Sequence, residues 1–200
     1  MPGQRESQAT RREQILEAAY EVALRRGIDG LTVRAVAARA RLSHSLVLFH
    51  FKRKDQLGLG LLDRVLAGTL SLTVPNEVRT IRKPRERLQA LVGQELRRMS
   101  EEPRRLRLLL EFWARGGHNA VIRQKIGAGL EEYRTAFKDV VSEMSEAKPG
   151  RGTSSAGLAA VAVSLIIGYP VQTMIDPKWV GPEEYLASVH DVLDRLGKAA

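Results

Sequence analysis

The sequence predicts an all-α protein of about nine helices, in which a three-helix unit of helix-turn-helix type precedes a six-helix bundle. Apolar residues recur at helical spacing through most of the chain, and no stretch alternates for long in the manner of a β-strand. Serine or threonine precedes the first three apolar segments as a helix cap, and glycine or proline separates the longer ones. We therefore expect an N-terminal domain of residues 1–54 and a larger domain of residues 55–200.

Caps and glycines bound the first two helices. Thr10, with Glu13 three residues later, matches a capping box and predicts the start of the first helix. Gly27 and Gly30 end that helix, because glycine favours the helical conformation less than any residue except proline. Thr32 is the expected N-cap of a short second helix.

A third short helix follows a tight turn, with Ser43 as its expected N-cap. Val47 and Phe51 lie four residues apart, so they share one helix face and are expected to pack inward. The basic run 52–54 closes this helix, and Asp55 begins a longer one. Six longer helices are expected at residues 55–73, 84–100, 103–116, 119–146, 153–175 and 182–197. The proline and glycines of Lys148–Gly152 predict a loop there.

Positive charge is concentrated in the first half of the chain. The 200 residues carry a formal net charge of +9, to which residues 1–60 and 61–110 contribute +5 each and residues 111–200 contribute −1. A local excess of this kind favours a polyanion as partner. A solvated basic surface without a partner is the alternative that charge alone leaves open.

Composition and motifs exclude several classes of protein. The chain has no cysteine, which excludes disulfides, thiolate metal sites and cysteine nucleophiles. It lacks His-Glu-x-x-His, a phosphate-binding glycine loop, a dinucleotide fingerprint and a Gly-x-Ser-x-Gly elbow, so we expect no enzymatic activity, no cofactor and no metal site. No secretory signal is visible, and the apolar run 158–167 is too short to span a bilayer. We therefore expect a cytoplasmic protein that does not contact a membrane.

Residues 31–57 carry the strongest functional signal. Two short helices meet at a tight turn, and the second presents a polar leading edge formed by Ser43, His44 and Ser45. The major groove of DNA is about 12 Å wide and accepts one helix, whose N-terminal residues reach the base edges. These side chains can hydrogen-bond bases or phosphates, and Leu46 can contact a thymine methyl group.

The third helix and the residues after it match a known pattern. Residues 43–51 have the sequence Ser-His-Ser-Leu-Val-Leu-Phe-His-Phe, followed by Lys54, Asp55 and Leu57. This resembles the TetR family of transcriptional regulators, whose third helix has the form Ser-x-Gly-x-Leu-Tyr-x-His-Phe before a lysine and an acid. The resemblance covers residues 10–57 and extends beyond them only in helix size and number. It implies a homodimeric repressor that binds a palindromic operator in double-stranded DNA and responds to a small-molecule effector.

The resemblance also implies roles for individual residues. Thr32 and Lys54 would bind backbone phosphates, and Arg34 would reach a guanine in the groove. Lys52 is a further phosphate candidate from its charge and position alone. The expected DNA-contacting residues are Thr32, Arg34, Ser43, His44, Ser45, Leu46, Phe49, His50, Lys52 and Lys54.

Three positions depart from the family pattern. Arg41 stands in place of the turn glycine, Ser45 in place of a helix glycine, and Leu48 in place of a tyrosine that binds a phosphate. Because leucine has no hydroxyl group, that phosphate contact should be absent. Arg41 must hold the turn without glycine, and its side chain can add a phosphate contact.

Aromatic residues gather in the second half of the chain, where the resemblance places an effector pocket. Such pockets are mostly apolar with a few polar groups, so a small, largely apolar effector is expected. Ordinary core packing is the alternative for each of these side chains. The expected effector-binding residues are Phe112, Trp113, His118, Tyr133, Phe137, Tyr169 and Gln172.

The predicted helix 153–175 is rich in small residues and apolar on nearly all sides. One chain of this size can hardly cover such a helix, so we expect a second copy to cover it together with the last helix. The expected interface residues are Ala159, Ala160, Val163, Ile167, Val189 and Leu193. A two-fold dimer would present two recognition helices to successive major grooves. A helical adaptor that binds a small molecule or protein but no DNA is the alternative function.

Overall fold

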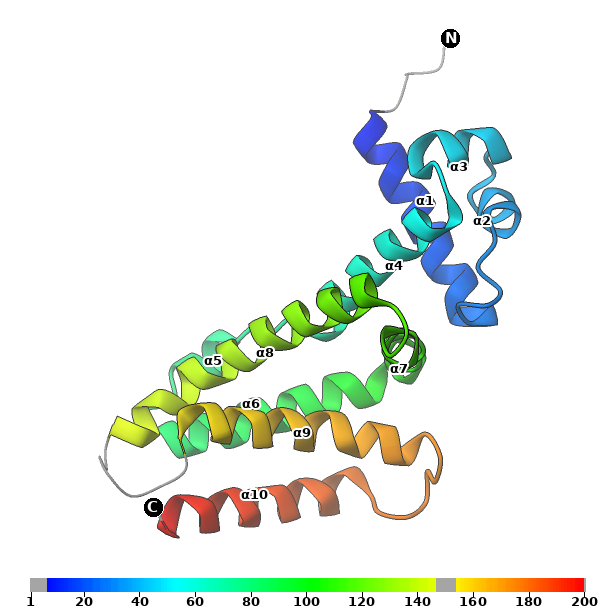
Figure 1. Ribbon diagram of the computed structural model, residues 1–200. Coiled ribbons are helices and arrows are strands. Elements are labelled where there is room, and N and C mark those ends of the chain that lie inside the picture. Colours follow the sequence, from blue (N-terminus) through cyan, green and yellow to red (C-terminus); the bar gives the residue numbers. More distant parts are fainter. Residues whose placement is uncertain (1–6, 147–153, 200) are drawn as a thin grey trace. The chain divides into compact units, whose positions relative to one another are not determined.

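The structure, a computed structural model, describes residues 7–146 and 154–199. Within these ranges it consists of ten helices and contains no strand, which confirms the all-α prediction (Figure 1). The additional helix is the short α5, in a region that the sequence assigned to a break. The helices are α1 (Gln8–Arg26), α2 (Val33–Ala40), α3 (His44–Phe51), α4 (Lys54–Thr69), α5 (Asn76–Arg79), α6 (Pro84–Glu101), α7 (Pro103–Gly116), α8 (Ala120–Glu146), α9 (Ser155–Thr173) and α10 (Pro182–Ala199).

The described chain forms two compact units. The head unit comprises the described residues up to Thr69 together with Arg107–Gly127, and the bundle unit comprises Leu70–Leu106 together with the described residues from Ala128 onward. Parts of α7 and α8 therefore belong to each unit. The predicted boundary between residues 54 and 55 separates a DNA-binding part from a part that binds the effector and the second chain. It differs from the boundary of the compact units, and it remains a prediction.

The three N-terminal helices follow from local signals, with one correction. The hydroxyl group of Ser7 accepts the Thr10 N–H at 3.1 Å, so the N-cap of α1 is Ser7 and the prediction of Thr10 was wrong. Both residues have the chemistry of a cap, and the helix takes the earlier one. The caps of α2 and α3 are Thr32 and Ser43, as predicted. Gly27 ends α1 with φ +67°, a conformation that favours glycine.

Polar contacts join α7 and α8 to the other helices of the head unit. The Glu111 carboxylate accepts the Ile28 N–H at 2.7 Å, directly after the end of α1. Two ion pairs also join these helices to the rest of the unit, between Arg115 on α7 and Asp29 at 2.5 Å and between Lys125 on α8 and Asp63 on α4 at 2.6 Å. Glu111 thus satisfies a backbone donor in the turn that precedes α2.

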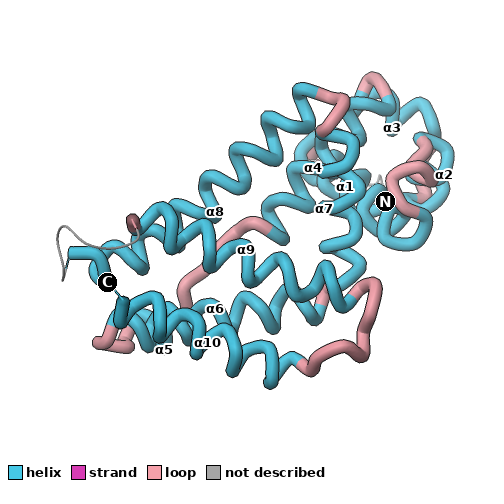
Figure 2. The backbone as a smooth tube through the Cα atoms, turned by 60° about the horizontal axis from the view of Figure 1, so that its bottom comes forward, coloured by secondary structure: helices cyan, strands magenta, loops and turns pink. Residues whose placement is uncertain are grey.

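The bundle unit is built on α6, against which α5, α9 and α10 pack. Figures 1 and 2 show α9 and α10 lying side by side. Their aromatic rings join them: Tyr169 and Tyr185 stack at 4.4 Å, and the Tyr185 hydroxyl donates to the Leu165 carbonyl at 2.9 Å. The predicted loop Lys148–Gly152 lies outside the described residues.

Helix α9 is more apolar over its whole length than the short run considered in the sequence suggested. It has 19 residues with a mean hydropathy of 1.5, which is enough to cross a membrane by length and composition alone. One such helix is weak support for a membrane span, because core helices of soluble proteins have the same character. Only 33 % of its most apolar 18-residue stretch is buried within the chain. Much of the helix surface is therefore accessible to another molecule.

Candidate nucleic-acid interface

Helix α3 is fixed from behind and capped at its start. Val47 and Phe51 are 0 % and 1 % exposed, and they are its only fully buried residues. The Ser43 hydroxyl accepts the Leu46 N–H at 3.2 Å and satisfies one of the free donors of the first turn. The helix is therefore held at its rear and at its first turn, while its other side chains are half-buried or exposed.

Residues of α1 and α4 hold the C-terminal end of α3. The Arg12 guanidinium lies over the Phe51 ring at 4.2 Å and donates to the His50 carbonyl at 3.2 Å. At Gly60 on α4, an added Cβ would lie 3.0 Å from Leu16 and 3.2 Å from the Phe51 ring. Glycine therefore lets α4 approach α1 and α3 closely, and α3 cannot turn about its axis without breaking these contacts.

The ten predicted DNA-contacting residues all lie in the head unit, on α2 or α3, at their caps, or at the start of α4. Eight of them are exposed, and Leu46 and His50 are half-buried. Phe49 is 65 % exposed and meets the His50 ring edge-to-face at 5.3 Å. The hydroxyl groups of Ser43 and Ser45 lie 3.1 Å apart. The structure thus brings the predicted residues together on an accessible surface, and their contacts with DNA remain a prediction.

The cations around α3 differ in whether they are neutralised. Arg39 on α2 pairs with Glu21. Arg34, Lys52 and Lys54 are exposed, and no described residue forms an ion pair with them. Their charge is therefore available to an anionic partner. The Thr32 hydroxyl accepts the Ala35 N–H at 3.1 Å, so it caps α2 in addition to its predicted phosphate contact.

The predicted effector residues divide between the two units. Phe112, Trp113 and His118 belong to the head unit, where Phe112 is buried and the other two are exposed. Tyr133 and Phe137 are buried in the bundle unit and meet edge-to-face at 5.3 Å. The other two bundle residues contact backbone: Tyr169 donates to the Val180 carbonyl at 3.1 Å, and the exposed Gln172 donates to the Gly168 carbonyl at 3.4 Å.

Glu95 is the central polar group of the bundle unit, and sequence reasoning did not identify it. It is 1 % exposed, accepts the Tyr133 hydroxyl at 2.8 Å and pairs with Arg98 at 2.6 Å. Burial lowers the pKa of Arg98, but the hydrogen bond to Glu95 and its charge outweigh this, so the pKa is raised. Burial, with the adjacent Glu95 charge, also raises the pKa of Tyr133, which therefore remains a hydrogen-bond donor.

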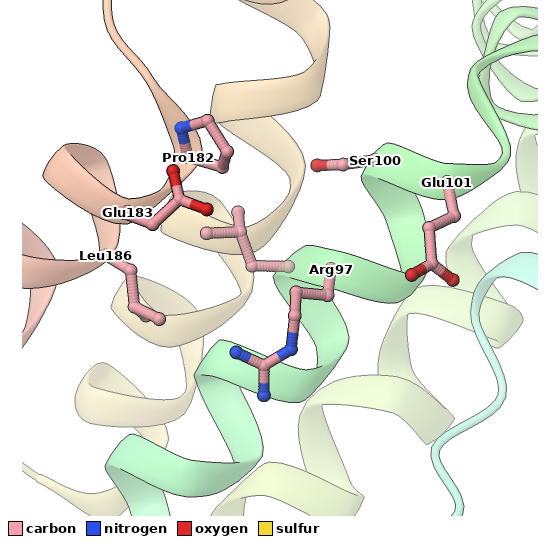
Figure 3. Close-up of a pocket in the computed structure, with 7 residues that line it drawn as sticks. Arg97, Ser100, Glu101, Pro182, Glu183 and Leu186 are labelled. Carbon is pink, nitrogen blue, oxygen red and sulfur yellow. The ribbon is translucent and has the colours of Figure 1, made fainter.

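A cavity of about 240 Å³ lies between α6 and α10 in the bundle unit (Figure 3). Its apolar part is formed by Leu96, Pro182 and Leu186, and charged side chains surround it. The hydroxyl oxygen of Ser100, which also lines the cavity, is buried without a hydrogen-bond partner. None of the seven predicted effector residues lines this cavity. The residues that do line it are Leu96, Arg97, Ser100, Glu101, Pro182, Glu183 and Leu186.

The predicted interface residues differ in how much surface they leave for a second chain. Ala160 is exposed and Ile167 is half-buried. The accessible side of α9 also includes Ala156 and Ser164, each four residues from Ala160. The interface itself remains a prediction. Four of the six predicted residues are buried within the single chain: Ala159, Val163, Val189 and Leu193.

Two family models match this chain and cover most of its length. The model of bacterial regulatory proteins of the tetR family matches residues 15–59, and the model of the BetI-type transcriptional repressor C-terminal region matches residues 84–198. A fold with an open recognition helix and a helical bundle defines a class of DNA-binding regulators. The chain belongs to the TetR family of transcriptional regulators, with a C-terminal region of BetI type.

The sequences of individual relatives align with nearly the whole chain. A helix-turn-helix transcriptional regulator from the dhlA 5′ region of Xanthobacter autotrophicus is 30 % identical over 195 residues, which cover 94 % of this chain and 92 % of that protein. The regulator BetI of Burkholderia ambifaria is 26 % identical and covers 93 % of each chain. These matches confirm the predicted family, and they give no support to an adaptor that does not bind DNA.

Solved structures share the same fold. A protein described as a transcriptional regulator from Saccharomonospora viridis, in complex with choline, aligns with a TM-score of 0.75 at 21 % identity. The alignment covers 93 % of this chain and 96 % of that one. At this identity the likeness shows the fold alone.

Proposed function

We propose that this regulator is a homodimeric repressor that binds a palindromic operator through α3 and leaves it when a small, largely apolar effector binds. The observation that carries the proposal is the asymmetry of α3. Val47 and Phe51 are fully buried on one side, while His44 and Ser45 are exposed on the other. A helix held in this way presents its front edge at no cost in core packing, which is what insertion into a major groove requires.

Contacts with phosphates and contacts with bases have different sources in this arrangement. Arg34, His44 and Ser45 face outward and carry donors suited to base edges, with Arg34 assigned to a guanine. Thr32 and Lys54 lie at the starts of α2 and α4, where they bind phosphates and fix the register of the protein. Base contacts provide sequence preference, and phosphate contacts provide affinity that depends on salt.

The effector binds the C-terminal region and opposes DNA binding by linkage. An effector that prefers one arrangement of the protein must weaken operator binding by the same factor by which the operator weakens effector binding. The cavity between α6 and α10 supplies open volume, and Tyr133 and Phe137, which do not line this cavity, are a separate candidate with buried aromatic surface. At about 240 Å³, this cavity is smaller than the roughly 300–1,000 Å³ of pockets for drug-sized ligands, so it suits a small molecule.

A second copy of the chain covers α9 in the proposed dimer. Much of this apolar helix is open in the single chain, and Val192 on α10 is 43 % exposed. Ala156, Ala160 and Ser164 have short side chains on the accessible side of α9, so another helix can approach closely. Burial in a dimer accounts for the apolar character of α9 without a membrane.

Selection of bound fragments from a pool of random duplex DNA tests the DNA-binding part of the proposal. We expect enrichment of an inverted repeat whose half-sites lie one helical turn apart, or a multiple of one turn. A single non-repeated site would contradict the two-fold dimer. A pool that shows no enrichment at low salt would contradict sequence-specific DNA binding itself.

The dimer is tested separately by Ala160→Glu, measured by analytical ultracentrifugation. A carboxylate on the accessible side of α9 would be buried without a partner in the dimer, so we expect a monomer. Glu184→Gln, at an exposed position on α10, serves as a control and should leave the dimer intact. A dimer of unchanged stability in Ala160→Glu would place the interface elsewhere.

A further inference from the structure

A cation in a backbone conformation that favours glycine lies on each side of α3, three residues before it and directly after it. Arg41 closes α2 just before α3 with φ +56°, and Lys52 follows α3 with φ +47°. Within the described residues, these two are the only non-glycine residues with positive φ. Their position on either side of one eight-residue helix calls for a physical explanation.

The backbone itself requires the conformation at Arg41. The Leu42 N–H donates to the Ala37 carbonyl at 2.9 Å, and the Arg41 N–H donates to the Ala38 carbonyl at 3.3 Å. This pair of bonds is the Schellman motif that ends a helix, and glycine is the usual residue in its left-handed position because it lacks a Cβ. Arginine therefore makes the turn less stable than glycine would.

The conformation at Lys52 is less common still. The Arg53 N–H donates to the Phe51 carbonyl, which closes a three-residue turn around Lys52 with positive φ. Turns of this hand are rare and strained for residues that have a Cβ. Lysine therefore strains the end of α3, as arginine strains the end of α2.

Within the described residues, neither side chain forms an ion pair that would offset this strain. Both are exposed, and no described residue forms an ion pair with either of them. Other cations of the head unit behave differently, since Arg39 pairs with Glu21 and Arg64 pairs with Glu17. A strained residue whose side chain the fold does not use is characteristic of positions that serve a ligand.

The position of the two cations indicates that ligand. Arg41 lies three residues before α3 and Lys52 directly after it, so one cation lies near each end of the helix that is proposed to enter the major groove. Backbone phosphates flank this groove on both sides. We propose that Arg41 and Lys52 bind backbone phosphates on the two edges of the groove, and that these side chains are retained for DNA affinity despite destabilising the fold. This inference rests on the proposed operator binding by α3.

Substitution by glycine separates the two effects, because it removes both the strain and the charge. We expect Arg41→Gly and Lys52→Gly to unfold at a higher urea concentration than the wild-type chain and yet to bind random-sequence duplex DNA more weakly. The slope of log affinity against log salt should fall by about 0.9 for each lost phosphate contact, or about 1.8 for a dimer that loses one contact in each protomer.

Two controls separate a specific contact from a general loss of charge. Arg41→Lys and Lys52→Arg keep the charge and the strain, so they should keep the wild-type salt slope and gain no stability. Arg25→Ala removes an exposed cation of α1 that lies roughly 20 Å along the helix from the Arg12 contact with α3, and it should change neither quantity.

Each part of the inference can fail separately. Glycine variants with the wild-type salt slope would overturn the phosphate contacts, and glycine variants less stable than the wild-type chain would overturn the strain. An equal loss of slope in Arg25→Ala would show that only net charge matters, which also overturns the inference. In all three cases the wild-type chain still binds DNA and the proposed function stands, whereas a wild-type chain that binds no duplex removes both.

Discussion

The cations around α3 and the charged groups at the centre of the bundle unit differ in their exposure and in whether they are paired. Arg34, Lys52 and Lys54 are exposed, and no described residue pairs with them. Glu95 is 1 % exposed and contacts both Arg98 and Tyr133. An exposed charge contributes little to folding and is free to bind a ligand, whereas a buried pair resists separation because either partner alone would be desolvated and uncompensated.

The difference predicts which substitutions affect stability and which affect binding. Changes around α3 should leave the fold intact and alter DNA affinity. Changes at Glu95 should destabilise the bundle unit before any effect on DNA can be measured.

Glu95→Ala should have the largest effect. It removes the carboxylate that pairs with the half-buried Arg98 and that accepts the Tyr133 hydroxyl, so the free energy of unfolding should fall by about 2–4 kcal/mol. Urea unfolding measures the loss. Glu131→Ala breaks an ion pair with Arg134 at the surface and should lose less than about 0.5 kcal/mol. Similar losses in the two variants would contradict the contrast between buried and exposed charge.

Arg34→Ala and Lys54→Ala should have the next largest effects. Both substitutions should change DNA affinity and leave the free energy of unfolding unchanged. Loss of the Arg34 contact should weaken operator binding by about 1–3 kcal/mol and relax base preference at one position in each half-site. Lys54→Ala should weaken all sequences alike and lower the salt dependence. Competition with a library of operator variants measures both. If Arg34→Ala weakens every sequence equally, Arg34 binds a phosphate and does not select a base.

The head unit was the more predictable region because its signals are local. Thr32 and Ser43 cap their helices through contacts three residues away, and Val47 and Phe51 are buried as their four-residue spacing predicts. Local signals fail where two candidates compete, as Ser7 and Thr10 do at the start of α1. The capping-box pattern of Thr10 and Glu13 favoured the wrong hydroxyl group, and Ser7, which has the same cap chemistry, begins the helix.

The bundle unit was less predictable because its contacts join distant residues. Glu95 and Tyr133 are 38 residues apart, and only the packing of α8 against α6 brings them together. In the sequence, Glu95 is one of many acidic residues on an amphipathic helix. The predicted effector residues Tyr133 and Phe137 do meet, whereas the lining of the cavity between α6 and α10 was not predicted at all.

Ser43→Ala tests how much the N-cap of α3 contributes to the stability of the protein. The serine hydroxyl accepts the Leu46 N–H, so its loss should lower the free energy of unfolding by about 1 kcal/mol. Ser45→Ala removes a neighbouring hydroxyl that caps nothing and should change stability by less than about 0.5 kcal/mol. Thermal unfolding compares the two. Because Ser43→Ala removes this bond as well as the cap, an equal loss in Ser45→Ala would mean that the bond between the two hydroxyl groups, rather than the cap, stabilises α3.

Trp113→Ala should have the smallest effect on the protein without effector, and it bears on where the effector acts. Trp113 is 36 % exposed in the head unit, whereas its neighbour Phe112 is 2 % exposed. Removing the indole should change operator affinity in the absence of effector by less than about 0.5 kcal/mol. A small molecule found by thermal-shift screening of the wild-type chain then serves as the probe, and its power to dissociate the operator complex is measured in both proteins. A changed response with unchanged affinity places Trp113 in the effector site, and an unchanged response restricts that site to other residues, with Tyr133 and Phe137 the first to examine.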